Sequence, residues 1–370
     1  MDSPYLSNLE QRQGSATSSV EAALAALEIG IYRARFGDFT AAEQIANAVR
    51  AQFSDGSSGR VTVMLNLLEG LVPFFRDLAS TSRDRLQRAH VLSVAGRDRR
   101  LSALVSAWLA HVDFSLHRHA EMARSVRTCV ETIDASDTDT ICRLALTLGD
   151  AFCVAGLEGE SRAWYGAARN AAVKLGDHAT IAAMTGNSSS LRVFVARLSA
   201  ITASPSADHV NLIHGEAKTA LNYQSVAGLS SFDELLRSTY ASVLVLRGDY
   251  RAAIAELERL NLGEIRTSMA SQPVVLLSDV ALCLASVGRN AEAEQAIERF
   301  DVRRLEESTD DDVALACHSF AVACRALGRT DQASSFELMR EGALAKHRQE
   351  MQRLGDLLAP YRSTTVLPNA

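Results

Sequence analysis

A tight turn recurs three times in the second half of the chain, at a constant spacing of forty residues. The turns are centred on Gly248, Gly288 and Gly328, and each lies between two stretches whose apolar residues have helical spacing. Glycine accepts the left-handed backbone conformation that ends many helices. A single helical hairpin cannot bury its apolar face alone, so the repetition predicts a stack of such hairpins.

Small residues occupy fixed positions around each turn. In the clearest hairpin, Ala241 precedes Gly248 by seven residues, and Tyr250 and Ala253 follow it. The small residues allow two helices to approach closely, and the aromatic ring fills the space between them. The same pattern is carried by Gly30, Gly37, Phe39 and Ala42, by Ala281, Gly288 and Ala293, and by Ala321, Gly328 and Ala333. This arrangement resembles the tetratricopeptide repeat.

The resemblance covers residues 21–333 and departs from the family in two ways. The period is near forty residues instead of about thirty-four, and the closing proline is absent. Longer helices of this kind resemble the arrays of bacterial regulators and peptide-sensing proteins. The resemblance implies an all-α fold: an α-solenoid of about eight hairpins that forms a right-handed superhelix. One unit, residues 185–232, is expected to be longer than the others.

The two ends of the chain lack the repeat. Residues 1–20 are polar and rich in serine and glutamine, and we expect them to be a disordered tail. Residues 334–362 predict one long helix with Leu338, Leu344 and Met351 on its apolar side. Such a helix suits the capping of the last repeat, and a dimer-forming helix is the alternative. Residues 363–370 are expected to be a loose tail.

Composition restricts the setting and the partners. The formal net charge of −6 gives no reason to expect nucleic acid as an electrostatic partner. The start of the chain lacks the pattern of a secretory signal, and no apolar run is long enough to span a bilayer. Only three lysines accompany the arginines, which favours a high-GC bacterial genome. We therefore expect a cytoplasmic bacterial protein whose six cysteines are reduced core residues.

In tetratricopeptide arrays, the first helix of every hairpin lines the concave surface. The side chains expected there change from apolar in the first three hairpins to polar from the fourth onwards. The predicted groove residues are Leu67, Phe74, Trp108, Arg143, Asp150, Asn187, Ser190, Ser238, Ser242, Asp279, His318 and Arg325. The apolar end would accept a hydrophobic anchor, and the polar end an extended peptide. Alternatively, the apolar half is simply packed and the polar half solvated.

The run Thr185–Ser190 sharpens this hypothesis. It places threonine, glycine, asparagine and three serines inside a segment of helical length, although these residues are poor helix formers. Such a local conflict is expected at a functional site or at a break in the array. Asn187 is the member best suited to bond a peptide backbone.

No pattern predicts catalysis, a cofactor or a metal centre. His111, His117 and His119 lack the spacing for three ligands on one helix face. Cys317 and Cys324 are expected to be core residues. The arginine-rich stretch 83–100 is interrupted by aspartates, which favours a solvated face. Chaperone adaptors of the tetratricopeptide family clamp a terminal carboxylate with lysines, and this chain lacks lysines at the matching positions.

The sequence therefore predicts a non-catalytic scaffold, in which the groove of the solenoid binds a protein or a peptide. A regulatory role is implied only by the resemblance to long-helix sensor proteins. The alternative is a ligand- or peptide-responsive regulator that controls a partner enzyme or transcription factor. Neither hypothesis identifies the partner.

Overall fold

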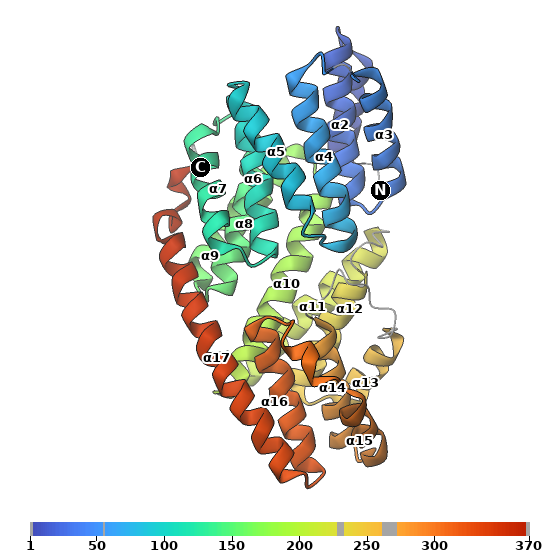
Figure 1. Ribbon diagram of the computed structural model, residues 1–370, viewed down its shortest axis with the longest axis vertical. Coiled ribbons are helices and arrows are strands. Elements are labelled where there is room, and N and C mark those ends of the chain that lie inside the picture. Colours follow the sequence, from blue (N-terminus) through green and yellow to red (C-terminus); the bar gives the residue numbers. More distant parts are fainter. Residues whose placement is uncertain (1–2, 55, 228–232, 261–271, 368–370) are drawn as a thin grey trace. The chain divides into compact units, whose positions relative to one another are not determined.

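The computed structural model describes residues 3–54, 56–227, 233–260 and 272–367 (Figure 1). Within these ranges the chain forms helices and no strands. The α-helices are α1 (Pro4–Gly14), α2 (Ser19–Arg35), α3 (Phe39–Gln52), α4 (Gly59–Asp77), α5 (Ser82–Ala95), α6 (Arg99–Ser115), α7 (His119–Thr132), α8 (Thr138–Val154), α9 (Glu158–Leu175), α10 (His178–Ala200), α11 (Ala207–Ala227), α12 (Asp233–Arg247), α13 (Tyr250–Arg259), α14 (Gln272–Ser286), α15 (Asn290–Arg299), α16 (Asp310–Ala326) and α17 (Thr330–Leu358). Three short 3-10 helices, η2 (Val302–Leu305), η3 (Ala359–Tyr361) and η4 (Thr364–Val366), complete the described elements.

Helices α2 to α17 pair in sequence as eight hairpins, which confirms the predicted solenoid of helical hairpins. The chain divides into two compact units. Unit 1 is built from residues 3–185 and 354–367, and unit 2 from 186–226, 233–260 and 272–353. Helix α10 begins in unit 1 and ends in unit 2, whereas α17 begins in unit 2 and ends in unit 1. Residues 228–232 of the predicted longer unit lie outside the described residues.

The predicted turn glycines adopt the left-handed conformation. Gly37 has a φ of 84°, and Gly248, Gly288 and Gly328 have values of 76°, 81° and 76°. At Gly248 the amide of the next residue, Asp249, donates to the carbonyl of Leu244 at 2.9 Å. This bond uses a carbonyl that the end of helix α12 would otherwise leave unpaired. The degenerate turn expected at Arg118–His119 uses His117 in the left-handed position, with a φ of 56°.

The small residues lie where helices touch. A Cβ atom placed on Gly149 of α8 would meet the Tyr165 ring of α9 at 2.8 Å. A Cβ atom placed on Gly30 of α2 would likewise meet the methyl carbon Cδ2 of Leu68 on α4 at 2.6 Å. A methyl group at either glycine would force the two helices apart, so packing within a hairpin (α8–α9) and between hairpins (α2–α4) depends on the absence of a side chain.

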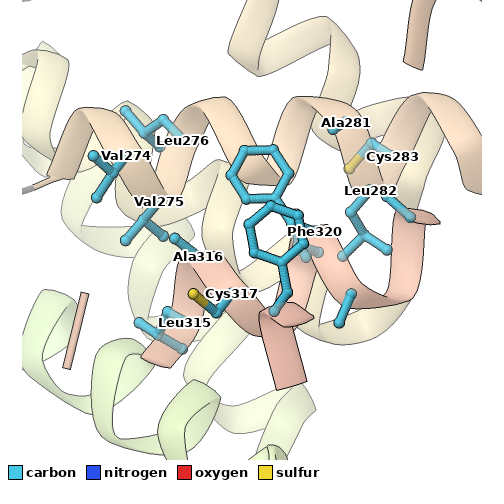
Figure 2. Close-up of a cluster of buried hydrophobic side chains, with 14 of the residues drawn as sticks. Val274, Val275, Leu276, Ala281, Leu282, Cys283, Leu315, Ala316, Cys317 and Phe320 are labelled. Carbon is cyan, nitrogen blue, oxygen red and sulfur yellow. The ribbon is translucent and has the colours of Figure 1, made fainter. Parts of the chain in front are cut away.

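The core of unit 2 is centred on α14 and α16. Figure 2 shows Leu276 and Cys283 of α14 lying with Leu315, Cys317 and Phe320 of α16 in one apolar cluster. The Phe320 ring also contacts Phe300 and Phe336, with ring centroids 4.5 and 5.1 Å away. Full burial of each such ring contributes about 1.5 to 3 kcal/mol to stability.

The expectation of a disordered N-terminal tail is wrong for residues 4–14, which form helix α1. Ser3 caps this helix, Pro4 stands at its first position, and Leu9 is buried. The Ser3 hydroxyl also donates to the Gly176 carbonyl at 3.1 Å. A serine cap followed by proline is a recognised helix start, and it outweighs the polar composition of the segment.

The C-terminal tail is also more ordered than expected. Helix α17 begins at Thr330, and residues 359–367 continue as short 3-10 helices. The indole N–H of Trp164 donates to the Tyr361 carbonyl at 2.8 Å, and Leu367 is buried. Apolar side chains of the tail supply the burial that orders it. Residues 368–370 lie outside the described residues.

Candidate functional site

The structure divides the twelve predicted groove residues by exposure. Seven are buried: Leu67, Phe74, Trp108, Arg143, Asp150, Ser238 and Asp279. Four are half-buried: Asn187, Ser190, Ser242 and His318. Arg325 is exposed and pairs with Glu337 of α17, the second helix of its own hairpin.

The prediction of an open apolar surface in the first three hairpins is wrong. Leu67, Phe74 and Trp108 are at most 3% exposed and belong to the hydrophobic core of unit 1. The Phe75 ring links Phe74 to Trp108, at centroid distances of 5.3 and 5.8 Å. The first helices of these hairpins pack on one another through these side chains, which buries Leu67, Phe74 and Trp108 and leaves Phe75 half-buried.

Asp150 and Ser238 are used inside their own hairpin or helix. The Asp150 carboxylate accepts a hydrogen bond from the Tyr165 hydroxyl at 2.7 Å, across the α8–α9 hairpin. The Ser238 hydroxyl donates to the Leu235 carbonyl at 2.8 Å. These contacts satisfy buried polar groups and favour a structural role for both residues.

A buried ionic cluster lies in the interior of unit 1. Nη2 of Arg35 on α2 lies 2.9 and 3.2 Å from the two carboxylate oxygens of Asp177, at the start of α10. Thr180 donates its hydroxyl proton to the same carboxylate at 2.7 Å, and its backbone N–H lies 3.1 Å away. Burial opposes ionisation of Asp177, yet Arg35 and Thr180 hold its pKa below the ordinary value.

Arg143 lies beside this cluster but has no carboxylate of its own. Its guanidinium carbon is 3.9 Å from the centroid of the Trp108 ring, a close cation–π contact. Burial, and then the charge of Arg35, lower the pKa of Arg143 to about 10. One turn earlier on α8, the half-buried Asp139 has its pKa raised to about 6, mainly by burial and then by Asp177.

A second buried ionic cluster joins the first helices of unit 2. Arg197 on α10 donates to both carboxylate oxygens of Asp279 on α14, at 2.7 and 2.6 Å. Arg197 also donates to the Ser242 hydroxyl on α12 at 3.2 Å. The Ser319 hydroxyl on α16 donates to Asp279 at 2.9 Å. Four first helices therefore contribute one polar side chain each to a single linked group, which we call the Arg197 cluster.

Half-buried polar residues lie on the same helices. Ser190 of α10 is hydrogen-bonded to Thr239 of α12, with hydroxyl oxygens 2.8 Å apart. On α16, His318 precedes Ser319 of the Arg197 cluster, and no described residue forms a hydrogen bond with its buried Nδ1 atom. Burial, and then Arg340, lower the pKa of His318, which favours the neutral imidazole.

The Thr185–Ser190 run is helical throughout. The Thr185 hydroxyl donates to the Ile181 carbonyl four residues earlier, at 2.8 Å, a bond that occupies the hydroxyl within the helix. The boundary between the two units falls between residues 185 and 186. The unfavourable helix composition thus coincides with the point where α10 passes from one unit to the other.

Sequence reasoning missed the arginines that organise both clusters. Arg35 and Arg197 each stand in a helix whose neighbouring residues are largely buried. An arginine is rarely buried without a partner, so an arginine among buried residues indicates a buried ion pair. This was the signal available in the sequence. Their aspartate partners lie 142 and 82 residues further along the chain, and no local pattern connects them.

Reactive chemistry is not favoured at the cysteines. All six are free and buried, and burial raises the pKa of the Cys142, Cys283 and Cys317 thiols to about 12. A thiol with such a pKa carries almost no thiolate at neutral pH, and the thiolate is the nucleophile. No helix among the described residues has the length and apolar character needed to cross a bilayer.

Comparison with known proteins assigns the fold. No family model matches the sequence, and no curated protein matches it. The crystal structure of a Rap protein complexed with Competence and Sporulation Factor is similar, with a TM-score of 0.59 and 11% sequence identity. The similarity covers 89% of this chain and 99% of that chain. At this identity the likeness concerns the fold, and the chain has the tetratricopeptide-like helical-repeat fold.

Proposed function

We propose that this protein is a non-catalytic regulatory scaffold that binds a peptide or a protein segment on the first helices of unit 2. The Arg197 cluster carries the proposal, because it draws polar side chains from α10, α12, α14 and α16 to one place. Half-buried Asn187, Ser190 and Ser242 lie on the same helices.

The chemistry of these side chains suits an extended peptide. Serine hydroxyls and an asparagine amide offer both donors and acceptors to a peptide backbone. The buried Arg197–Asp279 pair would hold in fixed positions the helices that carry these serine and asparagine side chains. A rigid surface lowers the entropy lost on binding. The similar Rap structure contains a bound factor, which supports peptide or protein binding by this fold.

A second candidate is a ligand- or peptide-responsive sensor that controls a partner enzyme or transcription factor in the bacterial cytoplasm. The continuity of α10 favours it, because one helix belongs to both units. A ligand that changes the helix arrangement in unit 2 would then act on a helix whose first residues belong to unit 1. Such a ligand must bind the two helix arrangements with different affinity.

The test uses the full chain and a library of short synthetic peptides carrying a fluorophore, with binding measured by fluorescence anisotropy. We expect saturable binding by a subset of peptides. Asn187→Ala should weaken that binding by about two- to tenfold, the effect of one hydrogen bond of about 0.5 to 1.5 kcal/mol. Its melting temperature should stay within about 1 °C of wild type, since the removed group is half-buried and polar.

Asn222→Ala provides the matched control, because it makes the same change at an exposed position on α11 of the same unit. This variant should bind as wild type does. If Asn187→Ala lost stability and kept its affinity, the role of this face in binding would be refuted. If no peptide in the library bound, the choice of a peptide as partner would be refuted.

A further inference from the structure

Arg143 is a buried arginine with few hydrogen bonds from its guanidinium group. Its exposure is 4%, and its hydrogen bond is a long one, 3.4 Å from Nη2 to the Thr180 hydroxyl. Its Nε–H group is buried and has no hydrogen-bond partner among the residues that the structure describes. A guanidinium has five N–H donors, and the Nε donor of Arg143 is one that is shielded from water and left without an acceptor among the described residues.

The neighbouring acidic groups Asp177 and Asp139 attract Arg143 electrostatically but compensate its burial only in part. The Asp177 carboxylate is already bonded by Arg35 and Thr180. Asp139 stands one turn before Arg143 on α8, but no ion pair or hydrogen bond joins them. Burial of a cation without a directly bonded carboxylate is unfavourable, and arginines at such positions normally have a planar acidic partner.

A second orphan atom lies in the same place. His111 is 8% exposed, and within the described part of the chain its Nδ1 atom has no hydrogen-bond partner. Its ring contacts Trp108 at a centroid distance of 6.0 Å, and Trp108 is the ring that Arg143 covers. Burial, and then Arg143 and Arg35, lower the pKa of His111 to about 3, so the ring is neutral. A neutral imidazole can donate one hydrogen bond to an anion without adding charge.

We propose that Arg143, fixed on the face of Trp108, is the anchor of a binding site for a small oxyanion, either free phosphate or a carboxylate group. Two oxygens of such a group match the fork of a guanidinium. His111 would act as an additional donor, and the Trp108 ring holds the guanidinium plane in place. The site lies in unit 1, so it is independent of the peptide surface proposed for unit 2.

The probes are sodium phosphate, sodium acetate, and one short peptide prepared with a free and with an amidated C-terminus. Each is titrated into the full chain at constant ionic strength, with sodium chloride as the reference salt. The melting temperature is followed, together with tryptophan emission in a Trp164→Phe background. Trp108 is then the remaining one of the two tryptophans. Saturation by phosphate alone identifies a phosphate site, and a response to the free but not the amidated peptide identifies a terminal carboxylate.

Arg143→Gln should weaken binding by about tenfold or more, the effect of losing a charged hydrogen-bond donor. Arg143→Lys keeps the positive charge but loses the paired N–H donors of the guanidinium. It replaces the glutamine variant as the test if that variant fails to fold. It should weaken binding by a smaller factor. Arg124→Gln is the matched control, because it removes an arginine of the same unit whose side chain is 70% exposed. Asn187→Ala should leave anion binding unchanged even if peptide binding is lost.

Two results would overturn the proposal. One is a wild-type response to phosphate, acetate and the peptides that equals the response to chloride at the same ionic strength. The other is a saturable response that Arg143→Gln retains in full while the variant remains folded.

Discussion

Removal of the Asp279 charge should destabilise unit 2 strongly. In the Arg197–Asp279 pair the side chains are 7% and 1% exposed, and two hydrogen bonds of 2.7 and 2.6 Å join them. Asp279→Asn keeps the shape of the side chain and removes its charge. Arg197 would then be a buried cation without a counter-charge, which costs about 3 to 5 kcal/mol. For a unit of this size, that loss lowers the melting temperature by roughly 6 to 20 °C.

The measurement combines urea unfolding with amide hydrogen exchange, because the repeats of a solenoid need not unfold together. Amides of α12 and α14 should exchange faster in the variant, and amides of α4 and α6 in unit 1 should not. Asp249→Asn provides the control. Asp249 is 3.0 Å from Arg247 at the surface of the same unit, and exposed pairs contribute about 0 to 1 kcal/mol.

Replacing both Arg197 and Asp279 distinguishes two quantities. One is the destabilisation caused by a buried charge without its partner, and the other is the net contribution of the ion pair to stability. Arg197→Met combined with Asp279→Leu should recover most of the loss, since apolar residues of similar volume can replace a buried ion pair. If Asp279→Asn alone lowered the free energy of unfolding by less than about 1 kcal/mol, water or neighbouring groups would have to reach Arg197. The account of the Arg197 cluster as a buried ionic group would then fail.

Two further predictions concern unit 1. Gly70→Ala should cost about 1 to 3 kcal/mol in urea unfolding, because the new methyl group would overlap Leu86. Gly166→Ala, with no atom within 4 Å of the new group, should instead stabilise by about 0.5 to 1 kcal/mol; equal effects at both sites would contradict the packing argument. Asp139 has a pKa of about 6 in the folded protein, above its ordinary value of 3.8, so the folded state binds the proton more tightly. The stability that this group contributes is present at low pH and is lost as the pH rises through 6. Asp139→Asn should therefore stabilise by about 1 to 3 kcal/mol at pH 7.5 and by about half as much at pH 5, and a pH-independent effect in thermal unfolding would refute the assignment.

The repeat architecture was predictable because its signals are local. A turn glycine and the small residues around it belong to one hairpin. Residues at these fixed sequence spacings are therefore close together in the structure. Gly37, Gly248, Gly288 and Gly328 all have the expected positive φ. The turn at His117 shows that a non-glycine residue can take the same conformation when the flanking helices pack well.

The interior of unit 1 was not predictable in the same way. Spacing along a helix shows which residues share a face, but it does not show whether that face is open. Trp108 and Arg143 do share one interior, as the groove prediction required, yet both are buried. Their burial depends on contacts between distant hairpins, and the Arg35–Asp177 pair, 142 residues apart, is one of them.

The two ionic clusters also change what can be expected of this solenoid. In a linear array each repeat contacts its neighbours alone, and the array bends by small movements at every interface. Arg35 reaches from the first hairpin to the start of the fifth, and Arg197 from the fifth to the seventh. Each of these bonds needs a fixed distance between helices that are not neighbours along the array. Gradual bending inside either unit would break a buried ion pair and is therefore unfavourable.

The residues with the lowest helix propensity in α10 are 185–190, at the boundary between the two units. We therefore expect a bound partner to change amide hydrogen exchange most at this segment of α10 and least at the two buried ion pairs, Arg35–Asp177 and Arg197–Asp279. The opposite pattern would show that the clusters do not stiffen the units.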